Sequence, residues 1–223
     1  MKELNPAQIS VSASLAALVH SFIGKENAAK LVEEIAVIIQ NDHLDFLERN
    51  KQLDNWLTNN PACEVLGDVL FDLLMVQFLS AEMHDEEYFD SPEWNEIENK
   101  TLDRGSEMLN LFLYLSEARE TEVEISLEDF LNEFLLVGED EFQDEYRIYE
   151  SLIVNEDLIE ANLDEIRKIQ KTVKPDTGLQ DYFVSLVLFF QAAEGVSTQE
   201  ELIEGLEAFE LAILQGMLAF HQN

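Results

Sequence analysis

Apolar residues recur along most of this chain at spacings of three and four, which is the period of an amphipathic α-helix. The clearest stripe lies near the C-terminal end and comprises Leu202, Leu206, Phe209, Ile213, Met217 and Phe220. The same period, taken between capping and turn signals, predicts helices over 6–23, 26–41, 43–58, 62–82, 92–118, 127–137, 141–154, 156–172, 178–194 and 199–220. We therefore expect an all-α fold, a compact multi-helix bundle of about eight to ten helices that are mostly antiparallel neighbours.

Two of these helices, 62–82 and 178–194, are apolar nearly all round rather than along one face. A helix of this kind is normally buried, so both are expected to run through the core. The stretch VSLVLFF within 178–194 would also suit a buried strand by composition. A helix is the preferred interpretation, because no nearby segment offers a strand partner.

Proline and capping residues mark where several helices should begin. Proline follows a capping residue at Asn5-Pro6, Asn60-Pro61 and Ser91-Pro92. Capping-box spacing occurs from Ser126 and from Thr198. We expect the helices that these signals delimit to form one all-α domain over residues 1–223.

A weak subdivision is expected near 171–178, where the sequence KTVKPDTG holds a proline and a glycine. The densest basic run, Arg167, Lys168, Lys171 and Lys174, overlaps this segment. Cations at the C-terminal end of helix 156–172 would complement the helix dipole. An anion-binding site is the alternative interpretation of the same run.

The formal net charge is −34, and most of it lies in the middle third of the chain. Residues 82–165 contain 28 Asp and Glu against four Lys and Arg, a net of −24. Such a field repels nucleic acid and anionic membrane and attracts basic partners. Fourteen Phe, five Tyr and two Trp favour a folded protein with an acidic surface over a disordered acidic tail. Adaptation to high salt would also give an acidic surface, but clustered acids favour a site.

Cysteine content and hydropathy indicate in which cellular compartment the protein is expected. Cys63 is the single cysteine, so no intramolecular disulfide is expected, and its place in an apolar helix predicts a buried, inert thiol. Residues 1–14 lack a basic segment followed by an apolar core, so we expect no signal peptide. The densest apolar run, 182–190, is far shorter than a membrane span of about 20 residues. A cytoplasmic protein without membrane contact is the simplest expectation.

Aromatic residues are interleaved with the acids in DEEYFDSPEW, which we expect to be a loop. Aromatic anchors within a charged rim are typical of protein-binding surfaces. A second acidic segment, GEDEFQDEY, places six acids in nine residues, and a basic partner would relieve their repulsion. The predicted partner-binding residues are Asp85, Glu86, Glu87, Tyr88, Phe89, Asp90, Trp94, Glu139, Asp140 and Glu141. The aromatic residues that follow, Phe130, Phe134 and Phe142, are expected to face the core instead.

A second set of carboxylates suggests different chemistry. Glu64, Asp68 and Asp72 recur at i, i+4 and i+8, which places them on one face of a helix, and helix 26–41 carries Glu33 and Glu34. Carboxylates from two packed helices can hold Mg²⁺ or Mn²⁺. The alternative to a metal site is that Glu64 neutralises a helix N-terminus while Asp68 and Asp72 form a solvated seam.

The stretches KLVEEIAVI and EVLGDVLFDLL resemble the MazG-type all-α nucleoside-triphosphate pyrophosphohydrolases. That resemblance implies an E-E-x-x-E helix and an E-x-x-D helix that bind magnesium and the triphosphate. The sequence departs from this pattern at Val37 and Val65, where the family has acids. The resemblance implies an Mg/Mn-dependent enzyme as the alternative function.

The sequence contains no Walker loop, no G-x-S-x-G and no zinc spacing. The histidines lack the Glu-x-x-His spacing of a di-iron bundle. We therefore expect a non-catalytic acidic binding protein, without a cofactor, that engages a basic protein partner. It would act as an inhibitor or immunity-like protein, as a chaperone for a basic client, or as a mimic of nucleic-acid charge.

Overall fold

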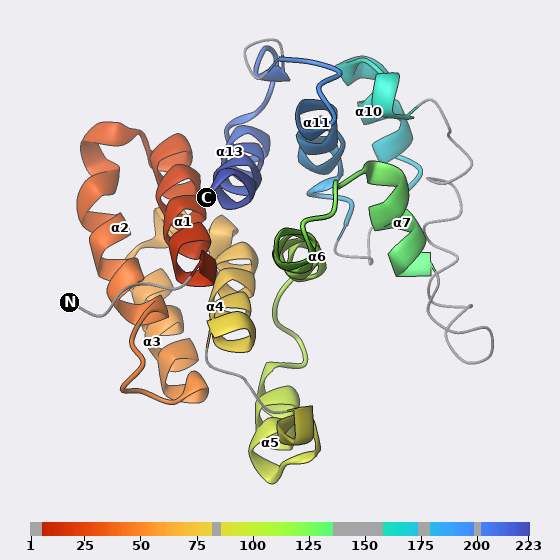
Figure 1. Cartoon of the computed structure of the whole chain (residues 1–223). Helices are drawn as coiled ribbons and strands as arrows, with labels where there is room; N and C mark the ends of the chain where they lie inside the picture. The colour runs from red at the N-terminus through yellow and green to blue at the C-terminus, as the bar shows by residue number, and fades with distance from the viewer. Residues whose placement is uncertain (1–5, 82–85, 136–157, 174–178, 199–201) are drawn as a thin grey trace. The chain divides into compact units, whose positions relative to one another are not determined.

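A computed structural model describes residues 6–81, 86–135, 158–173, 179–198 and 202–223. Over these ranges the chain forms ten α-helices and three 3₁₀ helices and no strand, which confirms the all-α fold (Figure 1). The chain divides into two compact units, 1–116 with 215–223 and 117–214. The predicted helix 141–154 lies outside the described residues. The organisation as one domain stays a prediction.

The first unit contains most of the helices. Its elements are α1 (Pro6–Ile23), α2 (Lys25–Ile39), α3 (Phe46–Asn59), η1 (Pro61–Leu66), α4 (Gly67–Ala81), η2 (Glu86–Asp90), α5 (Pro92–Thr101), the first part of α6 (Met108–Thr121) and the end of α13 (Ala208–Gln222). Helix α1 packs against both α2 and α4, and α3 packs against α2 and α4. Gly24 alone separates α1 from α2, and its φ of 88° allows the sharp turn between these two neighbours.

Helix α4 is the core helix of the first unit, as its all-round apolar sequence predicts. Every residue from 69 to 78 is buried, including the polar Asp72 and Gln77. The predicted helix 62–82 begins as the 3₁₀ helix η1, and the α-helix starts only at Gly67. An added Cβ at Gly67 would lie 3.3 Å from Leu57, so this glycine fits a close approach to α3. Cys63 is fully buried, as predicted, and burial raises the pKa of its thiol.

The predicted helix 92–118 is two helices, and this part of the prediction was wrong. Helix α5 ends at Thr101 and α6 begins at Met108. Gly105 between them has a φ of 88°, a conformation that interrupts an α-helix. We call the connecting residues 102–107 the α5–α6 loop. The predicted cap at the start of α5 is confirmed, because the Ser91 hydroxyl accepts a hydrogen bond from the Trp94 N–H.

The second unit is centred on a helix that is buried on all sides. Its elements are α7 (Leu127–Leu135), η3 (Leu158–Glu160), α10 (Leu163–Gln170), α11 (Phe183–Ala193), the end of α6 and the start of α13. Residues 183–191 of α11 are all buried, so the VSLVLFF stretch is a core helix rather than a strand. Phe130 packs its ring 5.6 Å from that of Phe190, as predicted for a core residue. The side chains of Phe134 and Phe142 lie outside the description.

Two helix starts differ from the sequence prediction. Helix α10 begins at Leu163 rather than near 156, because Asn162 and Glu165 form a capping box immediately before and within its first turn. Helix α13 begins at Ala208 rather than at 199, because Gly205 adopts a φ of 84° and packs against Leu163. Local turn chemistry in both places overrides an apolar period that continues through the turn.

Among the described helices, α1 has the length and mean hydropathy, 1.3, of a membrane-spanning segment. Secretory signal sequences and core helices of soluble proteins meet the same criterion. Helix α1 buries Val11, Leu15, Leu18 and Val19.

Candidate functional site

The predicted partner-binding residues 86–94 form η2 and the start of α5 rather than a loop. Glu87, Phe89 and Asp90 are exposed, and Tyr88 and Trp94 are partly buried. Glu86 belongs to η2, but its side chain is not described. Asp85, Glu139, Asp140 and Glu141 lie outside the described residues. We refer to the exposed face of η2 and α5 as the acidic-aromatic surface.

A series of edge-to-face aromatic contacts connects this surface to the core of the first unit. The distance between ring centroids is 5.0 Å for Phe89 and Trp94, 6.4 Å for Trp94 and Tyr88, and 6.0 Å for Tyr88 and Phe78. Phe78 in turn packs 5.1 Å from the buried Phe46 of α3. The series ends at Phe89, which is 47% exposed. A large aromatic ring is therefore held at the surface by side chains that are themselves packed.

The charge around these rings is strongly negative. Residues 86–107 contain eight Asp and Glu and two basic residues, a net of −6. Both cations already have partners, since Lys100 pairs with Glu96 at 2.5 Å and Arg104 pairs with Asp54. Burial, together with the carboxylates of Glu93 and Asp45, raises the pKa of Tyr88. The rings therefore lie in a field that favours a cation.

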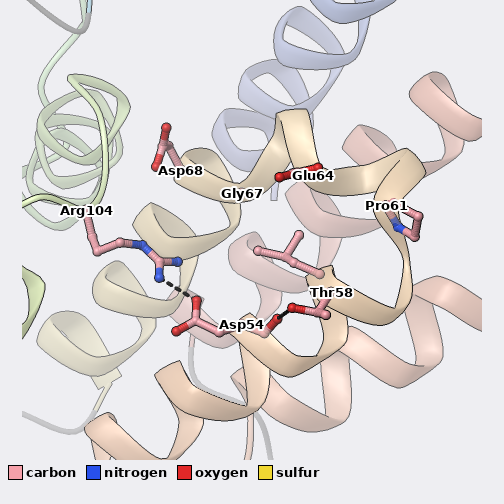
Figure 2. A pocket seen from close by; sticks show the side chains of 8 residues that line it. Asp54, Thr58, Pro61, Glu64, Gly67, Asp68 and Arg104 are labelled. Carbon is pink, nitrogen blue, oxygen red and sulfur yellow. Dashed lines mark hydrogen bonds and ion pairs between the residues drawn. The ribbon is translucent and has the colours of Figure 1, made fainter.

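A pocket of about 480 Å³ lies in the same unit, between α3, η1 and the start of α4. It is lined by Asp54, Leu57, Thr58, Pro61, Glu64, Gly67, Asp68 and Arg104. Figure 2 shows Asp54 and Thr58 on one side of it and Glu64 and Asp68 on the other. Its volume is in the range of small-ligand pockets, about 300–1,000 Å³. Three carboxylates and one guanidinium make this pocket acidic.

Arg104 reaches the pocket from the α5–α6 loop and pairs with Asp54 of α3 (Figure 2). Its guanidinium carbon also lies 5.2 Å from the centre of the Phe71 ring, within cation–π distance. Two elements that are distant in sequence are thus joined by one side chain. The pair also shows that the Asp54 edge of the pocket accepts a guanidinium group.

Asp72 is not part of a solvated seam, and that interpretation was wrong. Its side chain is fully buried, and Asp72 Oδ1 accepts a 3.0 Å hydrogen bond from the Ser106 N–H. The Ser106 hydroxyl lies 2.6 Å from Asp72 Oδ2. Burial raises the pKa of Asp72 to about 8, and the bonds to Ser106 only partly oppose this. The carboxyl is therefore mainly neutral at pH 7.

The five carboxylates of the magnesium interpretation do not converge. Glu33 is exposed, while Glu34 accepts a 3.2 Å hydrogen bond from Trp56 and pairs with Lys30. Glu64 and Asp68 line the pocket, and Asp72 is bonded to Ser106. Throughout the described ranges, no three His, Cys, Asp or Glu side chains form a group that could hold a metal ion. Val37 and Val65, which stand where the family has acids, are exposed.

Arg167, the first residue of the basic run near residue 170, has structural partners in the second unit. Arg167 lies in the last turn of α10, pairs with Glu210 at 2.7 Å and donates to the Gly205 carbonyl at 2.9 Å. Lys174 lies outside the described residues. Pairing with a carboxylate and a carbonyl agrees with a structural role for Arg167.

Three residues of the candidate site were missed by the sequence analysis: Asp54, Arg104 and Ser106. The signal for the last two was the turn sequence Asp103-Arg104-Gly105-Ser106, which the apolar period of 92–118 outweighed. Asp54 had no local signal, because its role depends on a loop 50 residues further along the chain.

No protein-family model, no curated protein and no solved structure matches the chain.

Proposed function

We propose that this protein is a non-catalytic binding protein whose acidic-aromatic surface engages a basic protein partner. The observation that carries the proposal is the exposed Phe89, supported on Trp94 and flanked by the exposed carboxylates of Glu87 and Asp90. A packed aromatic ring in an acidic rim is the arrangement that a partner's arginine or lysine side chain would fit.

The energetics of the surface support the same partner. Like charges held close together destabilise a protein alone, and a basic partner would relieve that repulsion. Long-range attraction would also speed association and make it dependent on salt. Because Trp94 and Tyr88 are already packed against other rings, little side-chain entropy would be lost on binding.

The acidic pocket supports the proposal as a second contact for a cationic side chain. Asp54, Glu64 and Asp68 line it together with the apolar side chains of Leu57 and Pro61. Such walls suit the alkyl part of lysine or arginine, and the carboxylates suit its charged end.

The test compares three immobilised proteins: the parent chain, a surface variant with Glu87→Lys and Asp90→Lys, and a control variant with Glu33→Lys and Glu117→Lys. All four positions are exposed, and both variants change the net charge equally. Each protein is used to capture host proteins at low salt and at about 0.5 M salt, where surface attraction is heavily screened. Captured proteins are quantified, and a purified partner is then titrated calorimetrically.

We expect the parent and the control variant to retain one basic protein in stoichiometric amount. The surface variant, with unchanged circular dichroism, should bind that protein about tenfold more weakly or worse. Equal binding by the surface variant, or the same diffuse set of basic proteins on all three, would overturn the proposal. Phe89→Ala separates the aromatic contribution from the charge.

A further inference from the structure

The α5–α6 loop is held against α4 through the side chain of Asp72. The backbone N–H and the hydroxyl of Ser106 both contact the Asp72 carboxyl, at 3.0 Å and 2.6 Å. Gly105 approaches so closely that a Cβ in its place would lie 2.7 Å from Asp72 Oδ1. The carboxyl at the centre of these contacts is fully buried. The protonation state of the Asp72 carboxyl therefore affects how strongly the loop is held against α4.

The same loop determines where Arg104 lies. Arg104 is one residue before Gly105, and its guanidinium is placed over Phe71 and against Asp54. Opening of the loop would move Arg104 away from the edge of the acidic pocket. The position of this cation is thus linked to the contact at Asp72.

The charges that act on the pKa of Asp72 disfavour its ionisation. Asp68 on the same helix and Glu107 at the end of the loop both raise the pKa of Asp72, in addition to burial. Arg104, the cation on this loop, pairs with Asp54. The other elements that pack on α4 also carry ionisable groups, but the charges that shift the pKa of Asp72 are those of Asp68 and Glu107. These groups are His20 on α1, Lys25, Glu26, Lys30, Glu33 and Glu34 on α2, Glu48, Arg49, Lys51 and Asp54 on α3, and Glu64 on η1.

A neutral carboxyl also fits the hydrogen bonds at this point. In the structure the Ser106 N–H and hydroxyl both donate to the Asp72 carboxyl oxygens. When the carboxyl is protonated, the Ser106 hydroxyl can rotate so that its oxygen accepts from the Asp72 O–H. The Ser106 hydroxyl oxygen also accepts a 3.1 Å hydrogen bond from the Met108 N–H at the start of α6. Asparagine at position 72 could make the same two bonds without carrying an ionisable proton.

We propose that Asp72 is a proton-dependent latch, a contact that holds the α5–α6 loop and Arg104 in place more tightly as the pH falls. When the loop opens, the carboxyl meets water and releases its proton, so opening is coupled to proton release. The population of the open loop then rises with pH until the carboxyl is also ionised in the closed state. A consequence, which rests on the proposed function, is that Asp54 becomes available to a partner's cation at neutral pH more than at acid pH.

The test is amide hydrogen exchange of Ser106 and Met108, measured by NMR and corrected for the intrinsic pH dependence of exchange. In the parent, the protection factors should fall by up to about tenfold per pH unit between pH 5.5 and 7.5. In Asp72→Asn they should stay constant within about twofold, because no proton is exchanged on opening. Asp103→Asn is the matched control, since it removes an exposed carboxylate on the same loop that does not act on the pKa of Asp72, and its protection factors should fall with pH as in the parent.

Constant protection in the parent, or an equal fall in Asp72→Asn, would overturn the latch. If Asp72→Asn does not fold, the carboxyl ¹³C shift of Asp72 in the parent gives the second measurement. The latch is supported if the ¹³C shift of Asp72 titrates near pH 8 and amide protection of the loop falls over the same approach to that pH. Titration of the shift near pH 4 overturns the latch. None of these measurements needs a partner, so failure of the latch is distinct from failure of the binding proposal.

Discussion

Glu194 Oε1 accepts a 2.8 Å hydrogen bond from the backbone N–H of Leu127, although these residues lie 67 positions apart in the chain. Leu127 is the first residue of α7, and Glu194 is the C-cap residue of α11. The end of one helix thus satisfies an N–H group that would have no partner at the start of another. The carboxylate also lies at the end of α7 where the helix dipole favours negative charge.

Removal of this acceptor should destabilise the second unit. Glu194→Ala is expected to lower the free energy of unfolding by about 1 kcal/mol, within the range for loss of a helix cap. Glu194→Gln keeps an acceptor oxygen and should lose less. Urea unfolding followed by circular dichroism measures both, and equal stability of the alanine variant and the parent would contradict a capping role.

The pH dependence of stability should carry a contribution from Asp72. Its pKa in the folded protein, about 8, lies above its ordinary value of 3.8, so folding favours the neutral carboxyl. The resulting stability is fully present below about pH 4, is lost as the pH rises to about 8, and is constant above that. Asp72→Asn should therefore show a weaker decline in unfolding free energy between pH 5 and 8, and it should be more stable than the parent at pH 8.

Urea unfolding at several pH values checks this expectation. Other carboxylates of so acidic a chain also contribute to the slope, so the difference between parent and Asp72→Asn is the quantity of interest. Parallel curves for the two proteins would show that Asp72 has an ordinary pKa.

Any side chain at Gly105 should lower the free energy of unfolding. An alanine would adopt a φ of 88° and would place its Cβ 2.7 Å from Asp72 Oδ1 and 3.2 Å from Phe71. We expect Gly105→Ala to cost about 1–3 kcal/mol. Gly195→Ala is the control, because Gly195 also has positive φ, 73°, but a Cβ there would meet nothing within 4 Å. If Gly195→Ala lowers the free energy of unfolding less than Gly105→Ala, the difference measures the close contacts at Gly105. Equal decreases for the two variants would show that only backbone strain matters.

Alanine substitutions at Phe78 and Phe89 should distinguish a ring that stabilises the fold from a ring that is available to a partner. Phe78 is 8% exposed and Phe89 is 47% exposed, although Tyr88 and Trp94 link them in one series of rings. Phe78→Ala is expected to cost about 3–5 kcal/mol. Phe89→Ala should cost less than about 1 kcal/mol in the free protein, because much of its ring stays in water. Thermal unfolding checks both values, and a large loss for Phe89→Ala would indicate a structural role.

Much of the fold follows from the sequence, because helix burial depends on patterns that are local. Residues 69–78 of α4 and 183–191 of α11 are buried on all sides because nearly all of these residues are apolar. Ser91 caps α5 because a serine before Pro92 can accept from an N–H three residues on. These features depend on neighbours within one or two turns, which are visible in the sequence.

The tertiary structure alone decided the place of the carboxylates. Glu64, Asp68 and Asp72 share a face only if their segment is one α-helix, but Glu64 belongs to the 3₁₀ helix η1, which turns every three residues. Asp72 is buried because Gly105 and Ser106 fold back onto it from 34 residues away. The pairing of Asp54 with Arg104 likewise joins positions 50 residues apart. No periodicity encodes such contacts, since they depend on the path of the chain between the helices.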